Sequence, residues 1–191
     1  MGVIDLHFVT PDLAVGASFP MHAAARLARE HGIERVVDVR VEDRDDERLL
    51  SVHGIKLLHL PTEDCCAISP SHIRDGVAFA LDGMAHGERV LIHCQYGIGR
   101  SALLALCVLV ARGAAPLEAM ERLKEARPKV SPGPEQLSAF VEYCRVVRAD
   151  TRAGWQVPPV ERLGAIAWRH LLRDQGTVDA ARARAASTRR W

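Results

Sequence analysis

The stretch VLIHCQYGIGRSALLALCVLVA, residues 90–111, joins two apolar runs through a short loop that holds a cysteine, two glycines and an arginine. The first run, 90–92, is apolar throughout, which is typical of a central buried strand. The second, 102–111, predicts a helix that is buried on all sides. Glycine lets the backbone between them turn sharply and approach a ligand closely. The pattern therefore predicts a loop at the carboxyl edge of a sheet and at a helix N-terminus, where backbone N–H groups favour an anion.

Strands and helices alternate along the rest of the chain up to about residue 148. Strands are predicted at 8–15, where they would be edge strands, and at 35–39, 55–60 and 90–92. Helices are predicted at 22–30, 70–86, 102–111, 117–126 and 135–148. Residues 42–50 should form a surface helical turn, and we assign the charges of 42–46 to a solvated face. The order predicts an α/β fold with a central, mostly parallel sheet flanked by helices.

A change in composition near residue 150 divides the chain. At 191 residues and 48% hydrophobic, the chain can bury one good core, which we assign to residues 1–150. Residues 151–191 carry an excess of arginine and should form a basic helical C-terminal extension. We expect the apolar residues of this extension to pack partly against the domain: Leu163, Ile166, Trp168 and Leu171. We expect its last arginines to remain exposed for an acidic partner or substrate flank: Arg182, Arg184, Arg189 and Arg190.

The cysteines and the apolar runs indicate a cytoplasmic protein without a membrane span. None of the five cysteines stands in a CxxC pair, and Cys107 and Cys144 lie on apolar helix faces, where we expect core residues. The N-terminus lacks the pattern of a signal peptide, and no apolar run is long enough to cross a bilayer.

The loop itself carries chemistry at both ends. Arg100 offers a planar fork of donors that suits bidentate contact with a phosphate-like oxyanion. Cys94 would lie in the same positive field, which should lower its pKa from the free value of about 8.5 and make a thiolate nucleophile. A tight turn with a small buried cysteine is the alternative, but it explains neither Arg100 nor the glycines at 97 and 99.

The residues 93–101, HCQYGIGRS, resemble the HCxxGxxR[ST] motif of the cysteine-dependent protein tyrosine phosphatase superfamily. The surroundings resemble its compact dual-specificity branch over residues 8–148, including LPTED at 60–64 and RPKVSP at 127–132. The resemblance implies that Cys94 is the nucleophile, that Arg100 clamps the phosphate, and that Ser101 stabilises the thiolate as it leaves. His93 would tune the cysteine. The phosphate would be bound by Gln95, Tyr96, Gly97, Ile98, Gly99 and Arg100, without a metal or cofactor.

The leaving oxygen of an alkyl phosphate also needs an acid. Asp64 is the candidate, because it follows a predicted strand at the place where related phosphatases keep a mobile acid. Glu63 is the rival, and both could instead be solvated loop carboxylates. Many relatives carry asparagine where this chain has Gly133, so help in placing the hydrolytic water is not expected from that residue, and Gln136 would be structural only.

The expected substrate is a phosphorylated protein. A deep pocket would restrict the enzyme to phosphotyrosine, and a shallow one would also admit phosphoserine and phosphothreonine. The loop contains no lysine or second arginine, which argues against polyphosphorylated substrates. Two alternatives stay open: a phosphatase of small-molecule or RNA 5′ phosphates, and a catalytically silent phospho-residue binder. Cys65 and Cys66 adjoin the expected acid, so one of them could protect Cys94 under oxidation by forming a reversible disulfide with it. The alternative is that both are incidental loop thiols.

Overall fold

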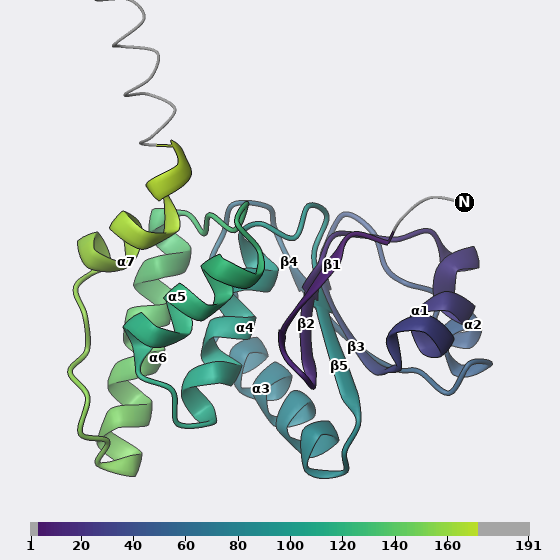
Figure 1. Cartoon of the computed structure of the whole chain (residues 1–191), viewed down its shortest axis with the longest axis horizontal. Coiled ribbons are helices and arrows are strands. Elements are labelled where there is room, and N and C mark those ends of the chain that lie inside the picture. The colour runs from purple at the N-terminus through teal and green to yellow at the C-terminus, as the bar shows by residue number, and fades with distance from the viewer. Residues whose placement is uncertain (1–3, 172–191) are drawn as a thin grey trace, which may run out of the picture.

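A five-stranded sheet forms the centre of the molecule in the computed structural model, which describes residues 4–171 (Figure 1). The strands follow the spatial order β1-β2-β5-β3-β4: β1 Leu6–Thr10, β2 Leu13–Gly16, β3 Ile33–Arg40, β4 Lys56–Thr62 and β5 Arg89–His93. β1 and β2 pair in antiparallel fashion, and the other pairs are parallel. The predicted α/β fold with a mostly parallel sheet is confirmed. Of the strands predicted within 8–15 as edge strands, β1 lies at the edge, whereas β2 is an inner strand because it pairs with both β1 and β5.

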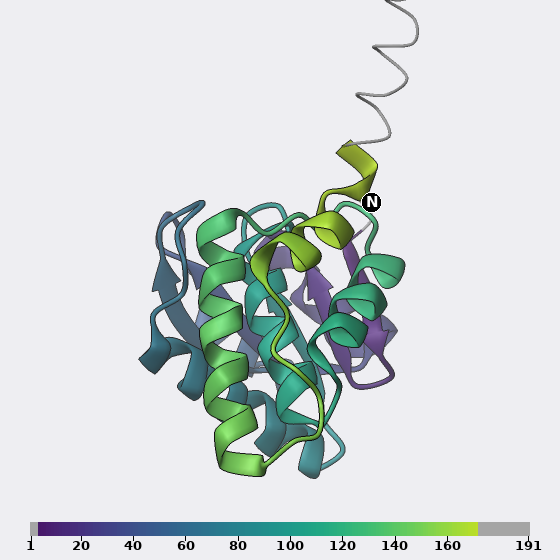
Figure 2. The same ribbon diagram turned by 90° about the vertical axis from the view of Figure 1, so that its left-hand side faces the viewer.

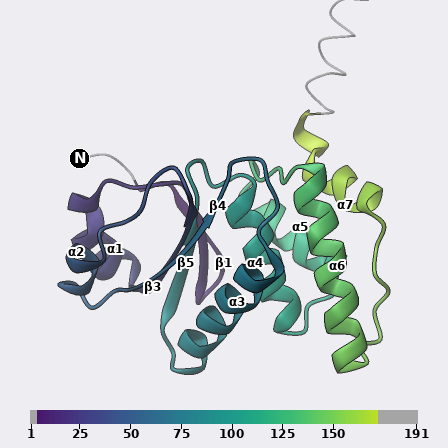
Figure 3. The ribbon, with the colours of Figure 1, turned by 180° about the vertical axis from the view of Figure 1, so that it is seen from behind.

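Helices cover both faces of this sheet (Figures 1 and 3). One face carries a 3-10 turn, Met21–Ala23, with α1 Ala24–His31 and α2 Glu47–Ser51; the other carries α3 Pro70–Ala85, α4 Arg100–Ala111, α5 Pro116–Ala126 and α6 Pro134–Thr151. Successive strand residues point to opposite faces. Thus Val36 and Leu91 pack in the smaller core beneath α1, whereas Val37 and Ile92 pack in the larger core beneath α4.

The helix α4 is the centre of the larger layer. Its residues from Arg100 to Val110 are all buried, and it contacts α3, α5 and α6. The prediction of a central helix from its wholly apolar sequence is confirmed. Because α4 follows β5 directly, the connecting loop lies at the carboxyl edge of the sheet, beside the ends of β3 and β4.

The extension begins at the end of α6 and returns along the domain (Figure 2). Its helix α7, Val160–Ala167, packs against α5 and α6 and buries Leu163 and Ala167, whereas Leu171 stays exposed. The arginines expected to meet an acidic partner, from Arg182 onward, lie outside the described residues, and the division at residue 150 stays a prediction. Within residues 4–171, no helix has the length and apolar character needed to cross a membrane.

Candidate active site

The loop 94–99 is shaped by glycine at the point where it bends. Gly97 has φ of 65°, in the left-handed region that favours glycine. A Cβ at this position would overlap the backbone of Gly16 and the guanidinium of Arg127. The backbone can therefore take this path only without a side chain at 97.

Cys94 is buried at the start of this loop. Its Sγ lies 3.3 Å from the Ser101 hydroxyl oxygen and accepts a hydrogen bond from the Gly97 N–H at 3.3 Å. Burial raises the pKa of the thiol, but hydrogen bonds from the Ser101 side chain and from the amides of Ser101, Ile98 and Gly97 outweigh burial and lower it. The structure thus brings together Cys94 and Ser101 as the sequence predicted, and the environment favours a thiolate.

Both Nη atoms of Arg100 are bound by the carboxylate of Glu42, a residue that the sequence did not mark as part of the site. Its Nη1 donates to Glu42 Oε2 at 2.7 Å, and its Nη2 donates to Glu42 Oε1 at 2.6 Å. Nη1 also donates to the Thr62 carbonyl at 2.8 Å, while Nη2 lies 3.0 Å from Asp64 Oδ1. Among the described residues, the buried Nε has no partner. The guanidinium is therefore fixed in orientation, with Nε left to donate to a bound phosphate oxygen.

The assignment of the charges at 42–46 to a solvated face was wrong for Asp45, whereas Glu42 stays exposed but is drawn into the site by its pairing with Arg100. The hydrogen bond from Arg100 holds the pKa of Glu42 at about 2, well below its usual range, against the opposing effect of partial burial. Asp45 is buried, and its Oδ2 lies 2.9 Å from Nε2 of His93. Both residues follow the carboxyl end of β3, which is the neighbour of β5 in the sheet. The acidic segment after β3 therefore contributes a buried carboxylate, Asp45, and a partner for Arg100, Glu42, to the site.

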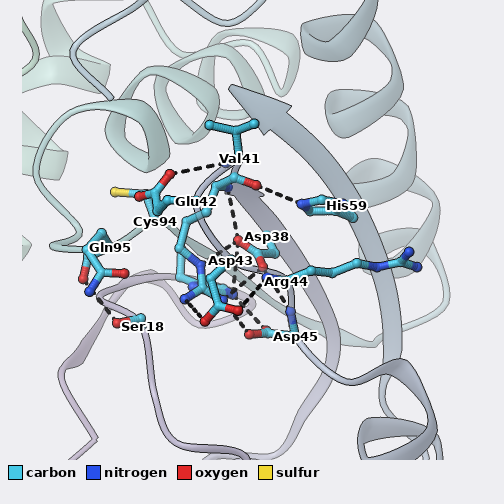
Figure 4. Close-up of polar contacts among 12 residues, drawn as sticks. Ser18, Asp38, Val41, Glu42, Asp43, Arg44, Asp45, His59, Cys94 and Gln95 are labelled. Atoms are coloured by element: carbon cyan, nitrogen blue, oxygen red, sulfur yellow. Dashed lines mark hydrogen bonds and ion pairs between the residues drawn. The ribbon is translucent and has the colours of Figure 1, made fainter. Parts of the chain in front are cut away.

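Asp38, Arg40 and Asp45 form a buried charge network next to His93. Figure 4 shows Asp38 and Asp45 side by side in this network. Arg40 donates to Asp38 at 2.9 Å and to Asp45 at 2.7 Å. Asp38, Asp45 and His93 offer three possible ligand atoms within 4.8 Å of one another. However, the Arg40 guanidinium already supplies a cation to both carboxylates, so these residues do not fit a metal ion.

Asp64 and Glu63, the two candidate acids, both lie at the mouth of the site. They border a cavity of about 620 Å³ together with Val41, Glu42, Asp43, Gln95 and Tyr96. Asp64 reaches Arg100, whereas the Glu63 carboxylate makes no hydrogen bond or ion pair to any residue in the range 4–171. This placement favours Asp64 over Glu63 as the residue nearer the phosphate, and its role as the acid stays a prediction.

Arg127 supports the catalytic loop from behind. The sequence indicated no role for this residue, which stands in the RPKVSP motif at 127–132. Its side chain is completely buried and donates to the carbonyls of Gly97 at 2.7 Å and Tyr96 at 3.2 Å. Its guanidinium also pairs with Asp5 at 2.7 Å, and the Arg127 hydrogen bond lowers the pKa of Asp5 to about 2. By engaging loop carbonyls, Arg127 holds the loop in the form that turns its amides toward an anion.

A second support comes from the loop 130–133, which we call the proline loop. The Ser131 N–H donates to the Ile98 carbonyl at 3.0 Å. Gln136 closes this side: its Oε1 accepts from the Gly133 N–H at 2.9 Å, and its Nε2 donates to the Cys66 carbonyl at 3.1 Å. Gln136 therefore links the proline loop to the segment that carries Asp64. This link is a structural role, as expected from the sequence.

The extension reaches the proline loop from its other side. The Trp168 indole N–H donates to the Pro132 carbonyl at 3.0 Å. Lys124 is buried, and its ammonium donates to the carbonyls of Val130 at 2.6 Å and Ala167 at 2.5 Å and contacts His170 Nδ1 at 2.8 Å. Burial lowers the pKa of Lys124 to about 8. The extension is thus joined to the catalytic loop through one intervening segment.

The remaining cysteines fall into two groups. Cys107 and Cys144 are fully buried, which confirms their assignment to the core. Cys65 is exposed with φ of 64°, and Cys66 is half-buried; both are free thiols. The disulfide between one of them and Cys94 stays a prediction.

Comparison with known proteins assigns the family. The model of the dual specificity phosphatase catalytic domain matches residues 17–146, which is more than half of the chain and includes the whole catalytic loop. The chain belongs to the dual specificity phosphatase family. Its members are cysteine-dependent phosphatases, and the matched residues include Cys94, whose role as the nucleophile stays a prediction.

Individual relatives within the family are distant. A mouse protein named phosphatidylglycerophosphatase and protein-tyrosine phosphatase 1 is 32% identical over 98 residues, 50% of this chain and 51% of that protein. The chain thus spans about half the length of that relative. Human dual specificity protein phosphatase 16 is 33% identical over 99 residues, 50% of this chain and 15% of that protein. A crystal structure of PTPMT1 in complex with PI(5)P has a TM-score of 0.72 at 24% identity, covering 76% of this chain and 98% of that one, and shows the same fold.

Proposed function

We propose that the protein hydrolyses phosphomonoesters on proteins, at phosphotyrosine and also at phosphoserine and phosphothreonine, through a cysteinyl-phosphate intermediate. The observation that carries this proposal is the buried Cys94 sulfur, hydrogen-bonded by Ser101 and Gly97 and lying in one loop with the oriented Arg100. A thiolate held among donors is a nucleophile aimed at an oxyanion bound by the same donors.

The reaction proceeds in two displacements. The Cys94 thiolate attacks phosphorus, the P–O bond to the leaving group breaks, and Asp64 gives its proton to the leaving oxygen. Water then attacks the phosphocysteine, Asp64 takes the proton of that water, and the thiolate leaves with a hydrogen bond from Ser101. Throughout, Arg100 and the loop amides bind the equatorial oxygens of the phosphoryl group.

A phosphatidylglycerophosphate is the second candidate substrate. The mouse relative and a relative in Arabidopsis thaliana, 32% identical over 107 residues, are both named for action on such a lipid. The same two displacements would serve a glycerol phosphate monoester. The RNA 5′-phosphate and small-molecule alternatives would use the same chemistry, and a silent binding module would hold phosphate without turnover.

Hydrolysis of p-nitrophenyl phosphate in the presence of EDTA tests the chemistry, and a panel of phosphopeptides, phosphatidylglycerophosphate, inositol phosphates and RNA 5′ ends tests the substrate. Cys94→Ser should abolish turnover while vanadate still binds, because a serine hydroxyl is not ionised near neutral pH. Arg100→Lys should be severely impaired, because an ammonium lacks the planar fork. Turnover by Cys94→Ser at the wild-type rate would refute the mechanism.

The predicted cytoplasmic location would be tested separately, by fractionation of cells.

A further inference from the structure

The mouth of the active-site cavity carries an excess of negative charge. Seven residues line this cavity of about 620 Å³: Val41, Glu42, Asp43, Glu63, Asp64, Gln95 and Tyr96. The four carboxylates among them, Glu42, Asp43, Glu63 and Asp64, form what we call the acidic rim, and the lining contains no lysine, arginine or histidine. They come from two loops, after β3 and after β4, which end beside each other in the sheet.

The neighbouring cations neutralise only part of this charge. Arg100 pairs with two rim residues, Glu42 and Asp64. Arg40 reaches the exposed Asp43 at 3.2 Å, but it already pairs with Asp38 and Asp45. The Glu63 carboxylate has no hydrogen-bond or ion-pair partner among the described residues. A net negative charge therefore remains at the mouth, although the floor of the site is built for a phosphate.

The floor and the rim would thus recognise opposite charges on one ligand. The buried, unpartnered Nε of Arg100 and the loop amides suit the phosphoryl group. The rim suits a cation a short distance away on the same molecule. Val41 and Tyr96, both more than half exposed, offer apolar surface to the stem of a lysine or arginine side chain, and the Tyr96 ring can also face its charge.

We propose that the preferred substrate is a phosphopeptide with lysine or arginine next to the phosphorylated residue. This proposal rests on the proposed function and names the substrate class of the same site. A phosphatidylglycerophosphate carries a second anionic phosphate close to the monoester, which would lie against the acidic rim, and an acidic phosphopeptide would do the same. Both are disfavoured by like-charge repulsion.

The experiment compares three phosphotyrosine peptides of equal length whose flanking residues are lysine, alanine or glutamate. We expect kcat/KM to fall in the order lysine, alanine, glutamate, with about tenfold between the extremes at low salt, as is reasonable for exposed charges a few ångströms apart. The ratio should shrink in 1 M salt, where the Debye length falls to about 3 Å.

Charge reversal at the rim isolates the cause. Glu63→Lys should reduce or invert the ratio of kcat/KM for the lysine peptide to kcat/KM for the glutamate peptide. A general loss of activity lowers both values and leaves this ratio unchanged. The matched control is Asp150→Lys, an equal charge change at an exposed residue near the end of α6. That residue lies about 21 Å along the helix from Gln136, which borders the catalytic loop, so the ratio should stay as in the wild type.

The outcomes separate this inference from the proposed function. If the wild type hydrolyses neither p-nitrophenyl phosphate nor any peptide, the proposed function fails and the inference fails with it. If it hydrolyses p-nitrophenyl phosphate and the three peptides, but with equal kcat/KM for the three peptides or with the highest kcat/KM for the glutamate peptide, the inference alone is overturned. A higher kcat/KM on phosphatidylglycerophosphate in vesicles than on the lysine peptide would also overturn it, in favour of the lipid.

Discussion

Glu42→Gln is the substitution that best tests whether Arg100 is held by a charged partner. Glutamine keeps the size of the side chain and one acceptor oxygen but removes the negative charge. The pKa of Glu42 falls from 4.5 to about 2, chiefly through the hydrogen bond with Arg100. At roughly 1.36 kcal/mol per pKa unit, this shift sets an upper bound of about 3.4 kcal/mol for the stabilisation by the charge.

Solvent screening reduces that bound. The Glu42 side chain is 37% exposed, and exposed ion pairs retain only a fraction of the ideal interaction, so we expect Glu42→Gln to lower the free energy of unfolding by about 1–2 kcal/mol at pH 7. Because the pKa in the folded state is lower than in the unfolded state, the contribution of Glu42 is complete above the unfolded pKa of about 4.5. It declines as the pH falls toward 2.

Urea unfolding at pH 7, 5.5, 4 and 3 measures this difference between the wild type and Glu42→Gln. The difference should be constant at the two higher pH values and shrink at the two lower ones. Glu63→Gln is the control: its carboxylate has no partner among the described residues, so its effect should stay within about 0.5 kcal/mol. A difference that is zero at pH 7, or equal at every pH, would refute the pairing of Glu42 with Arg100 as an ionic one.

Three further predictions concern the chemistry of the site. Asp64→Ala should lose about 10²- to 10⁴-fold in kcat/KM on phosphoserine peptides but far less on p-nitrophenyl phosphate, whose leaving group needs little protonation; the same pattern in Glu63→Ala but not in Asp64→Ala would move the acid by one residue. Ser101→Ala should raise the pKa of Cys94, which is measured as an upward shift in the pH midpoint of iodoacetamide alkylation, and an unchanged midpoint would exclude the hydroxyl as a significant donor to the thiolate. Mild peroxide should join Cys94 to Cys65 or Cys66, as shown by peptide mapping, whereas oxidation of Cys94 to sulfinic acid without a cross-link would contradict this protective role.

The fold and the catalytic loop could be predicted because their signals are local. The buried strand, the loop and the buried helix follow one another within residues 90–111, so a single stretch specifies the position of Cys94 and Arg100 at the carboxyl edge of the sheet. The end of the strand β4 at Thr62 placed both Glu63 and Asp64 at the same edge, and the family resemblance chose Asp64 between them.

The supports of the site could not be read from the sequence, because they join residues that are far apart in the chain. Glu42 and Arg100 are separated by 58 positions, and Arg127 and Asp5 by 122. The one signal available for Glu42 was topological: it follows a strand that proves to be the neighbour of β5, and carboxyl ends of parallel strands meet at one edge. Without the strand order, an acidic run looks like an ordinary solvated surface.

The docking of α7 has a consequence for anything attached to the chain beyond it. Trp168 contacts the proline loop, which itself contacts the catalytic loop at Ile98. Helix α7 and the loop from β5 to α4 accordingly lie at the same end of the molecule (Figure 1). A binding module or a peptide fused after residue 171 would start close to the entrance of the site. Its local concentration there would be set by linker length, and can reach the millimolar range for a short flexible linker. Under the proposed function, a fused phosphopeptide would be dephosphorylated within its own molecule, at a rate that does not depend on protein concentration.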